Sequence, residues 1–130
     1  MSKTGNEQLL HQGQTKKKAI ILLSGEDEHA KAFHALLYAL DLNEHGFEVK
    51  LYFDGAGTAG LRKLQEPNEK LREYFDQAME KGLVDTACNY CAHAFKSVEQ
   101  AKSLNVKLSP EGNHIPVGEM AKQGYELMTI

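Results

Sequence analysis

The chain has 130 residues, 42% of them hydrophobic and 25% charged, which is typical of a soluble globular protein of one domain. Its formal charge of −3 argues against a nucleic-acid or anionic-membrane surface. No apolar stretch reaches the length of a membrane span and residues 1–15 are polar, so we expect no membrane span and no signal peptide. Two cysteines are too few for a disulfide scaffold, and we therefore expect a cytoplasmic location.

The N-terminal part of the chain predicts a flexible tail, a strand and a helix. Residues 1–17 are polar and precede the single domain, which we place at 18–130. The uninterrupted apolar run within 18–24 predicts a strand that is covered on both faces, as in a parallel sheet. Acidic residues near the start of 25–44, and Gly46 after its end, predict a helix.

The middle of the chain predicts a second strand, a loop, a helix and a third strand. Apolar and polar residues alternate over 47–53, and the glycine-rich stretch 54–60 that follows predicts a flexible loop. Apolar residues spaced three and four apart over 71–79 predict an amphipathic helix that ends at Gly82. The apolar run 83–87 then predicts a strand that leads into the first cysteine.

The C-terminal part adds two short helices and two short strands. A Ser-x-x-Gln capping box at Ser97 predicts a helix over 98–104, and a strand is expected at 106–108. A last helix over 117–123 and a last strand over 125–130 complete the pattern. Strands that alternate with helices at this spacing predict an α/β protein with a mostly parallel sheet of about five strands.

Both cysteines lie in one four-residue stretch, Cys88-Asn89-Tyr90-Cys91, between the predicted third strand and a helix. The carboxyl ends of parallel strands are where sites gather in α/β sheets. Unpaired N–H groups and the positive end of a helix dipole favour a thiolate over a thiol. We therefore predict that Cys88 is ionised and accessible at neutral pH, and that this turn carries the function.

Three parts of the sequence resemble the DsrE/DsrF-like family of small sulfur-relay proteins. They are the segment 49–55 with the following 61–63, the segment 82–88, and the closing stretches 118–120 and 123–125. Together they span most of residues 18–130. The resemblance implies a three-layer α/β/α fold, assembly into a homo-oligomeric trimer or hexamer, and a persulfide carried on Cys88.

The leading functional hypothesis is intracellular sulfur trafficking, with the protein acting as a sulfurtransferase or as a sulfur carrier. Sulfur donor and acceptor proteins or small thiols would be its partners. Cys91, one helical turn after Cys88, could attack the persulfide, release sulfide and leave a disulfide. A thioredoxin-like dithiol exchange is an alternative, although the Trp-Cys-Gly-Pro context is absent. A non-catalytic oligomeric ligand-binding module, with cysteines that only pack, is the other alternative.

Zinc is a third chemistry that the cysteine spacing allows. Cys88 and Cys91 supply half of a tetrahedral ligand set, to which His93 or His114 could add. Because no second Cys-x-x-Cys exists and no fourth ligand is spaced for the site, this signal is weak. We therefore expect no metal and no cofactor.

The pocket around the cysteines is expected to draw on the first helix, the glycine-rich loop and the cysteine turn itself. The loop matches neither a P-loop nor a dinucleotide-binding motif, so we expect it to shape the pocket rather than to bind a nucleotide. The predicted pocket-lining residues are His29, Gly55, Gly57, Asn89, Tyr90 and His93.

Overall fold

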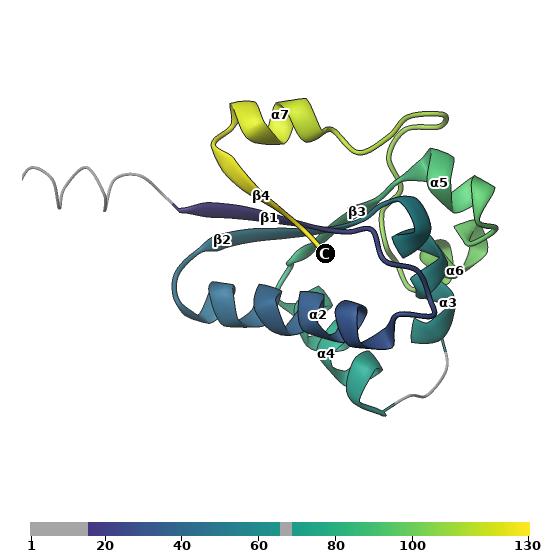
Figure 1. Ribbon diagram of the computed structural model, residues 1–130, viewed down its shortest axis with the longest axis horizontal. Helices are drawn as coiled ribbons and strands as arrows, with labels where there is room; N and C mark the ends of the chain where they lie inside the picture. The colour runs from purple at the N-terminus through teal and green to yellow at the C-terminus, as the bar shows by residue number, and fades with distance from the viewer. Residues whose placement is uncertain (1–15, 66–68) are drawn as a thin grey trace, which may run out of the picture.

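Four parallel strands form the centre of the protein (Figure 1). A computed structural model describes residues 16–65 and 69–130, so the predicted tail lies largely outside the described residues. The strands are β1 (Lys17–Leu22), β2 (Glu48–Phe53), β3 (Val84–Ala87) and β4 (Tyr125–Thr129). Their order across the sheet is β3-β2-β1-β4, which places the two six-residue strands, β1 and β2, in the interior of the sheet.

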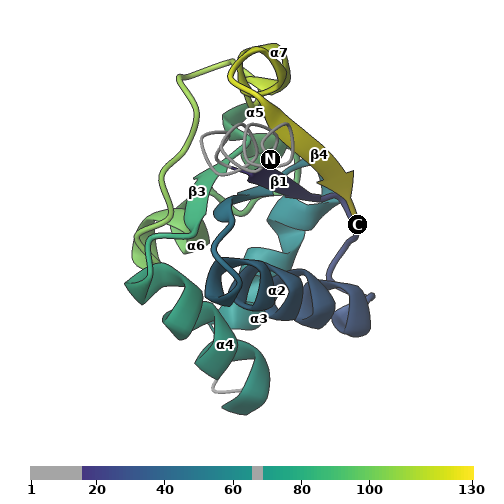
Figure 2. The same cartoon turned by 90° about the vertical axis from the view of Figure 1, so that its left-hand side faces the viewer.

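Helices cover both faces of this sheet (Figures 1 and 2). The helical segments are α2 (His29–Glu44), the 3-10 helix η1 (Gly55–Gly60), α3 (Leu61–Leu64), α4 (Glu69–Glu80), α5 (Asn89–Ala94), α6 (Val98–Ser103) and α7 (Val117–Lys122). The long helices α2 and α4 pack together on one face, and α7 lies on the other. The predicted three-layer α/β/α architecture is confirmed. None of the helices in the described ranges has both the length and the apolar character needed to cross a bilayer.

The two faces of the sheet bury apolar clusters of different size. Alternate residues of a strand point to opposite faces, so Ile20 and Leu22 face α2 and α4 while Ala19 and Ile21 face α7. The smaller cluster, on the α7 face, consists of Ala19, Ile21, Tyr52, Cys88, Ile115, Met120 and Tyr125. Cys88 is therefore a member of the core beneath α7.

The predicted fifth strand, at 106–108, is reduced to a single bridge between Ala87 and Leu108. The Ala87 amide donates to the Lys107 carbonyl (2.8 Å), and the Ser109 amide donates to the Ala87 carbonyl (3.0 Å). After Ala87 the chain turns into α5, so the pairing does not continue beyond this bridge.

Two helix N-termini differ from the sequence prediction, one in its position and the other in its capping. The first helix begins at His29, and the acidic stretch 26–28 before it forms a turn closed by the Glu28 amide and the Gly25 carbonyl (3.0 Å). Helix α6 begins at Val98 as predicted, but the Ser97 side chain makes no capping hydrogen bond. The Ser-x-x-Gln pattern thus marked the correct position without forming the predicted bonds.

The glycine-rich segment after β2 is the 3-10 helix η1 rather than a flexible loop. The Asp54 side chain caps it by accepting from the Gly55 amide (2.9 Å), and the Thr58 hydroxyl donates to the Gly55 carbonyl (2.8 Å). Gly57 lies so close to the end of β1 that an added Cβ would stand 2.0 Å from the Leu22 carbonyl oxygen. The glycines therefore permit close backbone packing here, a use that composition alone cannot distinguish from flexibility.

Substitution of Gly57 by alanine is expected to destabilise the protein by about 2–4 kcal/mol, because either η1 or the end of β1 must move to admit the methyl group. Gly60→Ala is the matched control, since a Cβ at that position meets no atom within 4 Å. It should change the free energy of unfolding by less than about 1 kcal/mol. Urea denaturation of the two variants measures the difference, and equal midpoints would contradict the packing role of Gly57.

Candidate functional site

The cysteine turn is built by backbone hydrogen bonds at the end of β3. The Cys88 amide donates to the Phe53 carbonyl of β2 (2.8 Å), which extends the strand pairing by one residue. The Cys88 carbonyl then accepts from the Ala92 amide (2.8 Å), and α5 begins at Asn89. At this N-cap position the Cys88 Sγ accepts from the Cys91 amide (3.3 Å). The predicted strand-to-helix turn is therefore present.

The Cys88 thiol is fully buried, with 0% of the residue exposed. Its polar neighbours include His114 Nδ1 at 3.4 Å and the Asn113 carbonyl at 3.9 Å. Burial in this cluster raises the pKa of the Cys88 thiol to about 11, and the hydrogen bond from the Cys91 amide offsets only part of that effect. The prediction of an ionised, accessible Cys88 is wrong. Desolvation outweighs the field of α5, which has only six residues.

Cys91 is the more accessible of the two thiols. It lies on the first turn of α5, is partly exposed, and its Sγ approaches Asp54 Oδ1 at 3.8 Å. Both cysteines are free, and their sulfurs lie with His114 Nδ1 in a group whose atoms are all within 4.8 Å of one another. The turn thus presents one buried and one partly exposed sulfur close together.

A stretch of chain from Ser109 to His114 covers the buried sulfur. The Asn89 amide donates to Ser109 Oγ (2.8 Å), and the Asn89 side chain donates to the Ser109 carbonyl (2.9 Å). Ser109 Oγ in turn donates to the Asn113 carbonyl (2.8 Å). The Tyr90 and His114 rings lie 5.0 Å apart, so the imidazole lies next to the cysteine turn. We call residues 109–114 the cover segment.

Asn89 is predicted from the sequence to line the pocket, but its contacts with Ser109 are not. Ser109 and Asn113 carry no such signal in the sequence. Their side chain and carbonyl reach the cysteine turn across twenty or more positions of sequence. No short-range pattern reports such a contact. His114 was named as a candidate zinc ligand, and the structure places it closer to Cys88 than the sequence could show.

The predicted pocket residues fall in three different places. Tyr90 and His93 line an open hollow of about 430 Å³ together with Ala94, Glu111 and Gly112. His29 lines a separate small hollow at the start of α2, among residues that include Glu26 and Lys63. Gly55 and Gly57 lie in η1, which packs against α5. The structure therefore groups Tyr90 and His93 near the cysteines and sets His29 apart from them.

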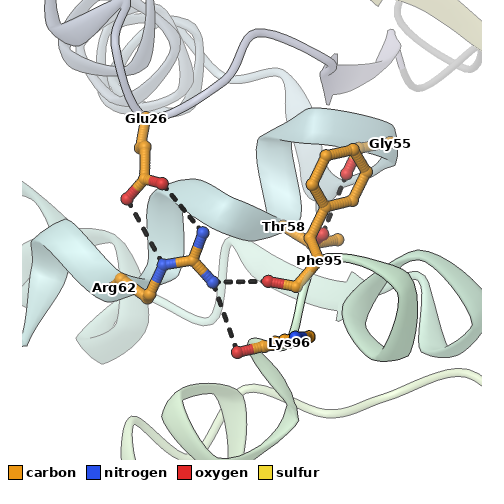
Figure 3. A network of polar contacts seen from close by, with 6 residues as sticks. All are labelled: Glu26, Gly55, Thr58, Arg62, Phe95 and Lys96. Atoms are coloured by element: carbon orange, nitrogen blue, oxygen red, sulfur yellow. Dashed lines mark hydrogen bonds and ion pairs between the residues drawn. The ribbon is translucent and has the colours of Figure 1, made fainter.

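An arginine joins the turn before α2 to the end of α5 (Figure 3). Arg62 donates from Nη2 to Glu26 Oε1 (2.8 Å) and from Nε to Oε2 (3.3 Å), and this contact lowers the pKa of the Glu26 carboxyl. The other guanidinium nitrogen, Nη1, donates to the carbonyls of Phe95 and Lys96, where α5 ends. Lys96 has a φ of 57°, a left-handed conformation that an anchored turn can sustain. Arg62 therefore holds the C-terminal end of the cysteine helix.

The fold and the site together define a class: a small parallel α/β protein with a paired-thiol site at the carboxyl edge of its sheet. In comparisons with known proteins, the DsrE/DsrF-like family matches residues 16–130. The chain belongs to the DsrE/DsrF-like family, a family linked to sulfur relay. The resemblance found in the sequence is confirmed.

Two individual proteins are similar to this chain, one in sequence and one in structure. The uncharacterized protein MJ0733 of Methanocaldococcus jannaschii is 28% identical over 100 residues, which cover 75% of this chain and 78% of that protein. The solved structure of BT1422, a conserved protein of unknown function from Bacteroides thetaiotaomicron, superposes with a TM-score of 0.63. At 21% identity over 87% of this chain and 95% of the other, that likeness is evidence for the fold alone.

Replacement of Arg62 by alanine is expected to lower the free energy of unfolding by about 1–2 kcal/mol. The ion pair is about one-third exposed and contributes little by itself, so most of the loss comes from the two carbonyls at the end of α5. Glu26→Gln is the control, because it leaves those carbonyl bonds intact. Measured by urea denaturation, Glu26→Gln should lower the free energy of unfolding by less than half as much as Arg62→Ala does. An equal loss in the two variants would assign the stabilisation to the ion pair.

The two thiols should differ sharply in reactivity in the folded protein. Iodoacetamide is expected to alkylate Cys91 at least about tenfold faster than Cys88 at neutral pH, because only Cys91 is partly exposed. Peptide mapping after timed quenching measures the two rates. The control is the unfolded protein in urea, in which Cys88 and Cys91 should be alkylated at the same rate.

The protonation state of Cys88 can also be followed as a function of pH. Because the folded-state pKa of Cys88 is raised to about 11, this residue should keep its proton as the pH rises through the ordinary range of a cysteine. The ¹³Cβ chemical shift of Cys88 in a Cys91→Ser variant should therefore stay at the thiol value up to about pH 10. A transition below about pH 8 would restore the sequence-based prediction of a thiolate.

Proposed function

We propose that this protein carries sulfane sulfur on the Cys88–Cys91 pair, and that Cys91 is the thiol that meets the donor. One observation supports this order above all others: a partly exposed sulfur and a fully buried sulfur lie close together at the carboxyl edge of the sheet. The family link to sulfur relay supports the type of chemistry. The sequence-based hypothesis placed the first step on Cys88, and its burial favours the reverse order.

In the first step, Cys91 as a thiolate attacks the outer sulfur of a donor persulfide. A bond forms between Cys91 Sγ and that sulfur, the sulfur–sulfur bond of the donor breaks, and the donor leaves as a thiolate. Cys91 then holds a persulfide, and the sulfur has moved without any external oxidant or reductant. The donor can be a small persulfide or a cysteine persulfide of another protein.

In the second step, the sulfur moves inward. Cys88 Sγ attacks the outer sulfur of the Cys91 persulfide, that sulfur–sulfur bond breaks, and the proton of Cys88 is returned to Cys91 Sγ. His114 Nδ1, 3.4 Å from Cys88 Sγ, is placed to take the proton during the transfer. The product is a persulfide on Cys88, buried from water and from competing thiols. An acceptor thiol would draw the sulfur out by the reverse sequence.

Two other functions remain as alternatives, each with its own supporting feature. Dithiol–disulfide exchange is favoured by the closeness of the two free cysteines. A ligand-binding module of the same fold is favoured by the hollow of about 430 Å³ beside α5, which includes the exposed Tyr90 ring. The experiment below separates all three.

Incubation of the reduced, metal-free protein with a small alkyl persulfide should add one sulfur atom, measured by intact-mass spectrometry. The Cys91→Ser variant should load at least about tenfold more slowly, because the remaining thiol is buried. The Cys88→Ser variant should load at the wild-type rate but lose its sulfur to a thiol reductant faster, since that sulfur stays at the partly exposed position. Circular dichroism of each variant verifies that it is folded.

Other results would contradict the proposal in different ways. An intramolecular disulfide without any sulfur adduct would support the redox alternative. No adduct and no disulfide, in folded wild-type protein, would support the binding module. Loading that requires Cys88 but not Cys91 would keep sulfur transfer and reject the order of the two thiols.

A further inference from the structure

Among the residues that the structure describes, one group of side chains has the chemistry and spacing of a metal site. It consists of Cys88 Sγ, Cys91 Sγ and His114 Nδ1, which all lie within 4.8 Å of one another. The histidine comes from the cover segment, 26 residues beyond Cys88. The fold thus supplies the third ligand that the Cys-x-x-Cys spacing lacks.

The separations fit a tetrahedral ion with little movement. With Zn–S bonds of about 2.3 Å and Zn–N bonds of about 2.0–2.1 Å, ligand atoms around one zinc lie about 3.5–4 Å apart. The observed distance from Cys88 Sγ to His114 Nδ1 is 3.4 Å. Because the widest pair is within 4.8 Å, the group needs to contract by about 1 Å or less to reach that geometry.

The charge of the group suits a buried divalent ion. Two thiolates and one neutral imidazole cancel the charge of Zn²⁺, so the complex is neutral and avoids the large cost of a net charge in an apolar cluster. Binding exchanges the two thiol protons for the ion. Sulfur and imidazole ligands also disfavour Mg²⁺ and Ca²⁺, which take oxygen ligands.

Neighbouring groups hold these ligands in place. The Cys91 amide donates to Cys88 Sγ at 3.3 Å, which stabilises a thiolate there. The Tyr90 ring lies beside the His114 ring, with 5.0 Å between their centroids, and hydrogen bonds from Asn89 to Ser109 fasten the start of the cover segment. Such surrounding contacts are what a preorganised metal site requires.

We propose that Cys88, Cys91 and His114 bind a Zn²⁺ ion, with a fourth position left for water or an incoming sulfur ligand. The ion uses the same two sulfurs as the proposed persulfide chemistry, so the two states exclude each other. Zinc would hold the pair as thiolates and protect it from oxidation until a sulfur donor or a stronger metal ligand removes the ion. This inference concerns the resting state of the pair and does not depend on sulfur transfer.

The test is zinc binding to the full-length, chelator-stripped and reduced protein, measured by competition with a chromogenic zinc indicator. We expect one Zn²⁺ per chain at micromolar or lower concentration. Co²⁺ in place of Zn²⁺ should give thiolate-to-cobalt charge-transfer absorption and the intense visible bands of a tetrahedral site. The Cys88→Ser and Cys91→Ser variants should each lose the charge-transfer band partly and weaken binding by about a hundredfold or more.

The sharpest comparison uses two histidines near the cysteines. His114→Ala should weaken zinc binding by about a hundredfold, because it removes a ligand from an exposed position without disturbing the core. His93→Ala is the matched control, since His93 is exposed on α5 and lies outside the ligand group. It should change the affinity by less than about twofold.

Three results would overturn the proposal. They are the absence of a one-to-one zinc complex at micromolar concentration, equal weakening by His93→Ala and His114→Ala, and a cobalt spectrum without thiolate bands. Failure of this test leaves the persulfide experiment unaffected, because that experiment uses metal-free protein and reads the added sulfur by mass. Conversely, zinc binding without any sulfur adduct would reject the proposed function and keep the metal site.

Discussion

The Cys88 sulfur lies in an apolar cluster beneath α7, where a histidine nitrogen, a carbonyl and an amide are its polar contacts. This removal from water determines the behaviour of the whole site. It raises the thiol pKa, leaves Cys91 as the sulfur that solvent can reach, and gives any species on Cys88 a protected place. A cysteine at the same strand end without a covering segment would have been the exposed nucleophile that the turn geometry predicts.

Backbone packing at the carboxyl edge of the sheet places the groups around these sulfurs. The close approach of Gly57 to the Leu22 carbonyl lets η1 dock against β1. Asp54, at the start of η1, therefore stands where its carboxylate both caps the 3-10 helix and approaches Cys91 Sγ. On the far side of α5, Arg62 holds the helix end. Both ends of the cysteine helix are thus positioned by residues from the segment that follows β2.

Much of the fold could be predicted from the sequence because its signals are local. The apolar run of β1, the periodicity of α4 and the position of the cysteine turn each depend on neighbouring residues. The state of Cys88 could not be predicted in this way. It depends on Asn113 and His114, which come from more than twenty residues away, and burial by such a segment leaves no periodic mark in the sequence. The glycines of η1 could not be interpreted from the sequence either, because glycine is favoured both in flexible loops and where two backbone segments pack closely. The predicted trimer or hexamer depends on other copies of the chain and stays a prediction.

The single bridge between Ala87 and Leu108 has a consequence for motion in this region. A full fifth strand would bind the stretch before the cover segment to the sheet with a continuous ladder, so that it could detach only when the domain unfolds. Two ladder hydrogen bonds flank this bridge instead, and the side chains of Asn89 and Ser109 add the further attachments. Local unfolding of this stretch therefore costs less free energy than unfolding of the four-stranded sheet. An opening limited to this stretch would uncover the inner sulfur and leave the four-stranded core intact.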